Sequence, residues 1–168
     1  LAVGWGLVPN VELARLLGCE LDVSATHPAV RADLRLRSSH PDIHAAGEAL
    51  GIGGRDCARI EGAMAACFAL GDERGGEALR ARRDSERAYA ALLRNHFAPA
   101  ARVHALASPD TLVCRCEEVT KAEVAAVLDD GGPSIGEVKR RTRCGMGRCQ
   151  GRFCGIAGAE ILAAARQA

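Results

Sequence analysis

Residues 142–154 have the sequence TRCGMGRCQGRFC, and this stretch decides how the last third of the chain folds. It sets Cys149 and Cys154 in a glycine-rich segment, and a second pair, Cys114 and Cys116, lies upstream in VCRCEEVT (residues 113–120). Each pair comes just before an expected helix start, because TKAE (residues 120–123) is a capping box and a helical pattern begins near Cys154. Helix N-termini offer unpaired N–H groups and partial positive charge. The two pairs therefore predict an anionic metal–thiolate centre.

A [2Fe-2S] cluster and a structural zinc site can both be held by four cysteines. Zinc sites usually contain CxxC pairs, whereas the spacings here are CxC and CxxxxC, which favours iron–sulfur over zinc. A rhombic cluster needs four ligands, and we assign them to Cys114, Cys116, Cys149 and Cys154. Cys144 is left out as a bystander, because Gly145, Met146 and Gly147 separate it from the fourth-ligand position.

The bulk composition restricts the classes of protein that fit. The chain has 168 residues, 48% of them hydrophobic and only 3% aromatic, so a core of small aliphatic side chains is expected. A net charge of +1 gives no general attraction to nucleic acid or anionic membranes. The longest apolar run, residues 63–70, is too short to span a bilayer. No export signal is visible, so reduced thiols and a cytoplasmic location are favoured over disulfides.

The remaining sequence predicts three parts. Residues 1–72 alternate strand-like runs with glycine turns. Residues 73–110 form a connecting helix (75–97) and a linker (98–110), and residues 111–168 form a small all-helical domain. In that domain SIGE (residues 134–137) is a second capping box and predicts a further helix start. In the first part we expect strands at 1–3 and 43–46, a helix at 11–17 capped by Asn10, and a helix at 55–70 entered through the turn at 51–54. A strand, a glycine turn and a helix together present free N–H groups to a phosphate. Cys19, Cys57 and Cys67 are expected to be buried apolar residues.

The cysteine segments resemble the 2Fe-2S domain of the bacterioferritin-associated-ferredoxin-like (BFD-like) family. The likeness covers about residues 111–156. It is closest to the version fused to FAD subunits of amine-oxidising dehydrogenases, such as opine oxidases, hydroxyproline dehydrogenases and hydrogen cyanide synthase, and also occurs in anaerobic glycerol-3-phosphate dehydrogenase. In that family the CxC pair and the two cysteines of GMGxCQGxxC hold the cluster, which again selects Cys114, Cys116, Cys149 and Cys154.

The first part resembles the same flavoproteins. VGWGLVPN (residues 3–10) is similar to their crossing from the NAD-type into the FAD domain, and HPDIHAAGEALGIGG (residues 40–54) to their late FAD fingerprint. The resemblance implies that Glu48, in place of the usual aspartate, binds the ribityl chain. The FAD contacts it implies are Gly47, Glu48, Gly51, Ile52, Gly53 and Gly54. No GxGxxG fingerprint is present, and the chain begins inside an apolar run, so we expect a C-terminal fragment.

The resemblance implies an α/β fragment of a two-dinucleotide-binding-domain flavoprotein followed by the small helical 2Fe-2S domain. It implies that electrons from amine or amino-acid (opine- or proline-type) oxidation pass through FAD and the cluster to an acceptor. A hetero-oligomer with a second flavin-containing dehydrogenase subunit is expected, and such partners could hold it at the periphery of the inner membrane. Three alternatives remain: a stand-alone 2Fe-2S binding module, a zinc-stabilised interaction domain, and a redox sensor in which Cys144 is the reactive thiol.

Overall fold

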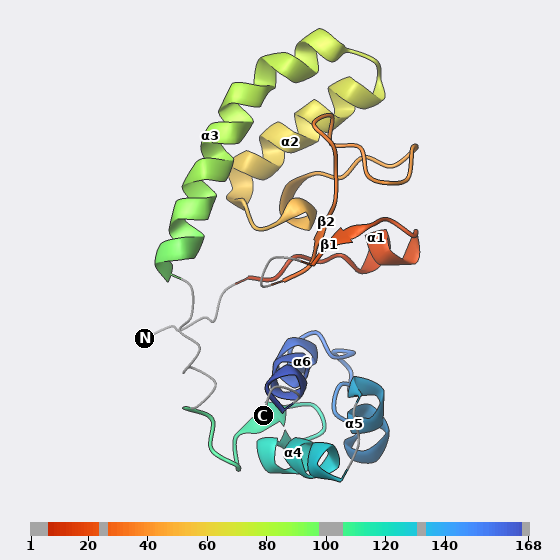
Figure 1. Cartoon of the computed structure of the whole chain (residues 1–168), viewed down its shortest axis with the longest axis vertical. Coiled ribbons are helices and arrows are strands. Elements are labelled where there is room, and N and C mark those ends of the chain that lie inside the picture. The colour runs from red at the N-terminus through yellow and green to blue at the C-terminus, as the bar shows by residue number, and fades with distance from the viewer. Residues whose placement is uncertain (1–6, 24–26, 98–105, 131–133, 166–168) are drawn as a thin grey trace. The chain divides into compact units, whose positions relative to one another are not determined.

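The computed structural model describes residues 7–23, 27–97, 106–130 and 134–165 (Figure 1). The chain separates into two compact units, residues 1–99 and 100–168. The expected strand at residues 1–3 lies outside the described residues. Within them the chain is mostly helical, and its strands are two or three residues long.

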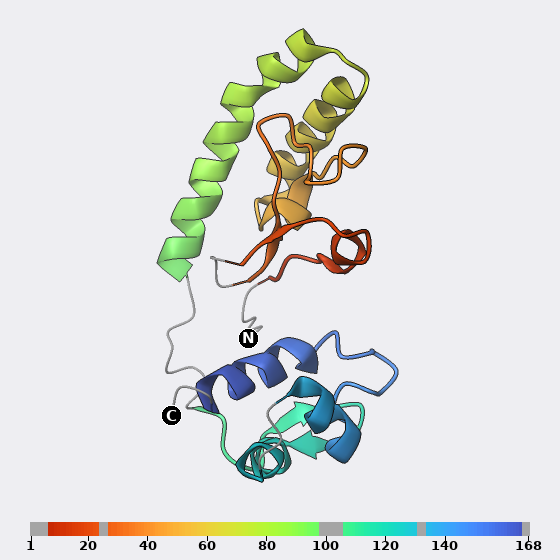
Figure 2. The same ribbon diagram turned by 45° about the vertical axis from the view of Figure 1, so that its right-hand side comes forward.

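The first unit is built around a pair of helices, α2 (Gly54–Ala69) and α3 (Glu73–Phe97), which lie side by side in Figures 1 and 2. The predicted helix 55–70 is thus confirmed. The predicted helix 75–97 begins two residues earlier, because the Asp72 carboxylate accepts the Gly75 N–H at 2.9 Å and caps it. Gly76 packs directly on the Phe68 ring, where a Cβ would overlap the ring. The small residue therefore lets the two helices approach closely.

Short elements cover this helix pair. Helix α1 (Glu12–Leu16) matches the predicted helix, and Asn10 Oδ1 accepts the Glu12 N–H at 3.2 Å. Strands β1 (Leu21–Asp22) and β2 (Ala29–Val30) pair antiparallel, and a 3-10 turn, η1 (Gly47–Leu50), leads into α2. Buried Leu36, Ile60, Met64 and Phe68 form the core beneath them.

The prediction of a strand at 43–46 is wrong. A single bridge joins Arg37 and His44, with Ala45 N–H donating to Leu36 O and Ser38 N–H to Ile43 O, both at 2.8 Å. Among the described residues the backbone of this segment pairs only with residues 36–38, and a strand needs a longer partner to extend its ladder. Of the three other cysteines, Cys19 and Cys57 are buried as predicted and Cys67 is half-buried.

In the described part of the second unit there are three helices, α4 (Lys121–Asp129), α5 (Ile135–Thr142) and α6 (Cys154–Ala165). It also has a small antiparallel hairpin, β3 (Leu112–Cys114) and β4 (Val119–Thr120), so the expectation of an all-helical domain is wrong. The hairpin forms because β-branched Val113 and Val119 favour extended backbone and Glu118 takes a left-handed turn conformation, φ 54°.

Both predicted helix starts in this unit are found. Thr120 Oγ1 accepts the Glu123 N–H at 3.3 Å, and the Glu123 carboxylate accepts the Thr120 N–H at 2.7 Å, a complete capping box. Ser134 Oγ accepts the Glu137 N–H at 3.2 Å, but the Glu137 carboxylate pairs with Arg140 instead of returning to the cap. Among the residues described, no helix is both long and apolar enough to cross a membrane.

Candidate metal centre

Five cysteines come together from four segments of the second unit. Cys114 ends β3, Cys116 lies in the β3–β4 turn, Cys144 follows α5, and Cys149 and Cys154 lie in the loop before α6 and at its first residue. Cys114, Cys144 and Cys154 are buried, with 1%, 3% and 2% of their surfaces exposed. Cys116 is exposed and Cys149 is half-buried. The site therefore has an inner, dry side and an outer side that meets solvent.

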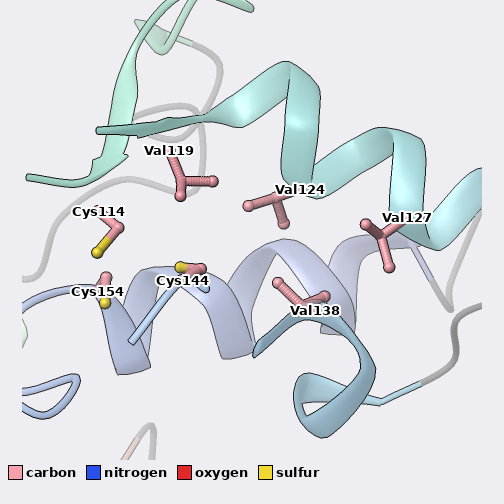
Figure 3. Packing of buried hydrophobic residues seen from close by; sticks show 7 residues of the cluster. All are labelled: Cys114, Val119, Val124, Val127, Val138, Cys144 and Cys154. Atoms are coloured by element: carbon pink, nitrogen blue, oxygen red, sulfur yellow. The ribbon is translucent and has the colours of Figure 1, made fainter. Parts of the chain in front are cut away.

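Three sulfurs form the inner group. The Sγ atoms of Cys114, Cys144 and Cys154 all lie within 4.8 Å of one another. Figure 3 shows them at one end of the buried cluster, with Val124, Val127 and Val138 at the other end. Cys144, which the spacing argument set aside, is thus part of a group with metal-binding geometry.

The predicted ligands pair across the two motifs, not within them. The Cys154 side chain lies beside that of Cys114, where Cys144 also lies, and the Cys116 side chain lies beside that of Cys149. One cysteine of the CxC motif therefore meets one cysteine of the CxxxxC motif in each pair. This brings segments that are more than thirty residues apart in sequence to one site.

Backbone N–H groups point at two of the sulfurs. Cys114 Sγ accepts hydrogen bonds from the N–H groups of Gly145, Glu117 and Cys116, and Cys149 Sγ from those of Phe153, Gly151 and Arg152. Burial raises the pKa of Cys114, but these hydrogen bonds outweigh it, so the pKa is lowered overall. The Phe153 N–H, followed by the Cys116 thiol, lowers the pKa of Cys149. Both positions thus favour thiolates, the form that binds metal.

The thiols of Cys154 and Cys144 differ from those of Cys114 and Cys149, because their pKa values are raised. Burial, followed by the hydrogen bond with Cys114, raises the pKa of Cys154 to about 12. Burial likewise raises the pKa of Cys144. A bound metal cation supplies the positive charge that buried thiolates need, and it deprotonates coordinating thiols.

The backbone around the cysteines is unusually bent. Three non-glycine residues there have positive φ: Glu118 (54°), Arg143 (63°) and Gln150 (54°). Gly145 (83°) and Gly151 (79°) also lie in this region, and their backbones pass so closely that a Cβ on Gly145 would stand 3.8 Å from Gly151 Cα. Strained backbone of this kind concentrates at functional sites. These residues turn the loop so that its N–H groups face the sulfurs.

Gly147 provides a direct test of the site's packing. A Cβ at Gly147 would overlap the Cys116 Cβ and lie 3.3 Å from its Sγ, so Gly147→Ala is expected to push Cys116 away and lower the iron content several-fold. Gly155→Ala is the matched control. It lies beside Cys154 in α6 with nothing within 4 Å of the new Cβ, and iron content should stay unchanged. Normal iron in Gly147→Ala would show that Cys116 does not need its present position.

The first unit holds the other predicted site. The glycine turn from Gly47 to Gly54 carries positive φ at Gly47, Gly51 and Gly54, and Glu48 Oε1 accepts the Gly54 N–H at 2.9 Å. Glu48 thus caps the start of α2 in this structure. A Cβ at Gly54 would meet no atom within 4 Å, so the helix start is open on that side.

A buried ion pair beneath this turn was missed from the sequence. Glu61 is fully buried and accepts the Gly47 N–H at 2.9 Å, Arg87 Nε at 2.8 Å and Arg83 Nε at 3.0 Å. Arg87 also donates to Gly51 O at 2.7 Å and Gly47 O at 3.2 Å. The charged side chains of α3 thus do not all form a solvated face, because Arg83 and Arg87 donate to the buried Glu61 carboxylate. Glu61 lies 26 residues before Arg87, so no local pattern signals their pairing.

With the geometry in view, comparison with known proteins identifies the class of this site. Residues 112–164 match the family model of the BFD-like [2Fe-2S] binding domain. The second unit thus carries a 2Fe-2S-binding domain of this family, and its cysteine group is a 2Fe-2S site.

Longer proteins are similar to this chain, two of them over about nine-tenths of its length and one over about a third. Hydrogen cyanide synthase subunit HcnB of Pseudomonas aeruginosa is 37% identical over 165 residues, which is 92% of this chain and 35% of the relative. An opine oxidase subunit of Rhizobium meliloti is 40% identical over 161 residues, 90% of this chain and 34% of the relative. Glycerol 3-phosphate dehydrogenase of Caloramator mitchellensis is 46% identical over 54 residues, 31% of this chain and 11% of the relative.

These relatives confirm the resemblance drawn from the sequence. The chain spans about a third of the length of the two curated relatives that are similar to nine-tenths of it. No solved structure matches it significantly. A 2Fe-2S site in a chain that is similar to an oxidase subunit and a dehydrogenase supports a role in electron transfer.

Proposed function

We propose that this chain is the electron-transferring part of an FAD-dependent oxidoreductase subunit. In this proposal amine or amino-acid oxidation, of opine or proline type, supplies electrons to FAD, and they leave through the 2Fe-2S centre to an acceptor. The single observation that carries it is the cysteine group of the second unit in a chain similar over nine-tenths of its length to an opine oxidase subunit. A 2Fe-2S centre takes up and releases one electron at a time, and the protein sets its position and potential.

The proposed ligands are Cys114, Cys116, Cys149 and Cys154. Two cross-motif pairs, Cys114 with Cys154 and Cys116 with Cys149, suit two metal ions that each take two thiolates. The N–H groups directed at Cys114 and Cys149 support the same assignment, because such donors stabilise the negative charge of a reduced cluster. This chain's backbone would thus hold the centre and tune its potential.

The proposed FAD contacts are Gly47, Glu48, Gly51, Ile52, Gly53 and Gly54. The glycine-rich backbone of the turn and the open start of α2 fit a close approach by a large anionic cofactor. Glu48 would have to exchange its bond to the Gly54 N–H for the ribityl hydroxyls. Arg87 and Glu61 would keep the turn in place from below.

The same proposal covers organisation and location. Residues 1–72 would be the C-terminal portion of an FAD/NAD(P)-binding domain, 73–110 a connecting helix and linker, and 111–168 the 2Fe-2S domain. The whole protein would join a second flavin-containing dehydrogenase subunit. Its proposed location is cytoplasmic, where those partners could hold it at the periphery of the inner membrane.

Metal analysis of the anaerobically purified chain tests the centre. We expect two irons and two acid-labile sulfides per chain, visible absorption from thiolate-to-iron charge transfer, and an EPR signal that appears on one-electron reduction. Zinc in place of iron, with no such absorption, would refute the electron-transfer proposal.

A second measurement separates the enzyme subunit from the stand-alone module. We expect the longer natural protein to copurify with FAD, and bound FAD to reduce the cluster when the amine or opine substrate is added. A full-length protein that holds the cluster but no flavin would support the stand-alone binding module instead.

A further inference from the structure

We propose that Cys144 is a fifth, ligand-competent thiol that can replace Cys154 on the 2Fe-2S centre. The inference rests on the proposed ligand set, to which it adds a residue. Cys144 Sγ lies within 4.8 Å of both Cys114 Sγ and Cys154 Sγ. Two sulfurs on one tetrahedral metal ion, at about 2.3 Å each, stand about 3.8 Å apart. Cys144 would therefore need to move toward Cys114 by about 1 Å or less to complete the pair.

The backbone of Cys144 is already held in the required place. Arg143 ends α5 in a left-handed conformation, φ 63°, which turns the chain inward at Cys144. The Cys144 N–H donates to Thr142 Oγ1 at 3.1 Å, and Thr142 Oγ1 donates in turn to Val138 O at 2.6 Å. These bonds fix Cys144 to the last turn of α5. Its sulfur is thereby held beside the two inner ligand sulfurs.

The neighbouring segments strengthen this placement. Gly145 follows Cys144 directly, its N–H donates to Cys114 Sγ, and a Cβ built on it would lie 3.8 Å from Cys154 Sγ. Arg143 Nε donates to Glu117 Oε2 at 2.7 Å and ties this segment to the turn after Cys116. Residues 143–145 therefore run alongside the inner ligands and supply a hydrogen-bond donor and a spare sulfur to the same place.

The replacement involves no electron transfer. When Cys154 is absent, the Cys144 thiol loses its proton to solvent and its sulfur forms the bond to iron that Cys154 would have made. The iron valences and the sulfides do not change. The replacement is limited to the inner side, because the group of mutually close sulfurs contains neither Cys116 nor Cys149.

A set of double variants tests the inference. The full chain is prepared as wild type, Cys154→Ala, Cys144→Ala and Cys154→Ala/Cys144→Ala, and each is reconstituted anaerobically with iron and sulfide. We expect Cys144→Ala to hold as much iron as wild type, and Cys154→Ala to hold most of it. The double variant should hold several-fold less. Its iron affinity should fall by more than the roughly 10–100-fold that loss of an outer-shell partner causes.

The matched controls are Cys149→Ala and Cys149→Ala/Cys144→Ala. We expect these two variants to lose the cluster to the same extent, because the group of close sulfurs that contains Cys144 includes neither Cys116 nor Cys149. Equal iron in Cys154→Ala and its double variant would overturn the inference and leave Cys144 as a buried packing residue beside Val138. Rescue of Cys149→Ala by Cys144 would also overturn it, since the spare thiol would then not be specific to the inner pair.

Serine variants keep the test decisive if Cys154→Ala does not fold. Cys154→Ser preserves size, and with Cys144 present we expect the all-sulfur EPR spectrum of wild type and protection of Cys144 from alkylation. A spectrum shifted by oxygen ligation while Cys144 is present would contradict the inference. Failure of the proposed function would be recognised separately. In that case the wild-type chain itself would bind no iron.

Discussion

Cys149→Ala is expected to abolish cluster binding and to loosen the second unit. Cys149 is half-buried on the outer side of the site, and among the described residues its sulfur neighbour is Cys116. Metal-binding free energy in a small domain is also folding free energy, and the core of this unit is made of valines and cysteines. Iron and sulfide content should fall to background, and the thermal transition of the second unit should move to lower temperature.

Hydrogen exchange measured by unit provides the control for this variant. Residues 112–164 should exchange faster in Cys149→Ala, while α2 and α3 keep their wild-type protection because they belong to the other unit. Cys67→Ala, a half-buried cysteine in α2, should keep full iron. A Cys149→Ala protein with two irons per chain would remove Cys149 from the ligand set.

Arg87→Ala is expected to destabilise the first unit by about 3–5 kcal/mol, the usual cost of breaking a buried ion pair. The guanidinium donates to the Glu61 carboxylate and to the carbonyls of Gly47 and Gly51, so its loss leaves a fully buried carboxylate short of partners. Urea unfolding followed by helical circular dichroism measures the change. Arg82→Ala, an exposed position on the same helix, should stay within about 0.5 kcal/mol of wild type.

The pH dependence of stability provides an independent check on this pair. Burial raises the pKa of Glu61, but the hydrogen bonds and charge of Arg87, followed by Arg83, outweigh it and hold the pKa below its ordinary value of 4.5. A carboxyl with a depressed pKa contributes stability above its unfolded pKa, and that contribution is lost as pH falls through the folded pKa. The wild-type unit should therefore lose stability below pH 4.5, and Arg87→Ala should lose less there. Equal acid sensitivity would contradict the proposed pairing.

Local sequence signals predicted the local structure well. The capping motifs at Thr120 and Ser134, the Asn10 cap and the glycine turn before α2 located four of the helices, because each signal depends on residues a few positions apart. The segment at 43–46 failed because a strand also needs a neighbour, which no local pattern guarantees.

The features missed from the sequence all depend on distant residues or on unusual backbone. Glu61 and Arg87 meet only because α2 and α3 pack together. Cys144 was set aside because a cluster needs four ligands and residues 145–147 separate Cys144 from the fourth-ligand position. The left-handed conformation of Arg143, which turns Cys144 inward, has no sequence signal, because glycine is the residue expected there.

The contacts of Arg87 also determine the order in which parts of the first unit can form while the chain is being synthesised. The carbonyls of Gly47 and Gly51 receive their guanidinium bonds from a residue 40 and 36 positions later. When the glycine turn of a nascent chain has left the ribosome, the Gly47 and Gly51 carbonyls still lack their bonds to Arg87 until α3 has emerged and packed on α2. The turn therefore completes its hydrogen bonds late, after the helix pair has formed, and a nascent chain whose emerged part ends between residues 54 and 87 should be sensitive to protease at the turn.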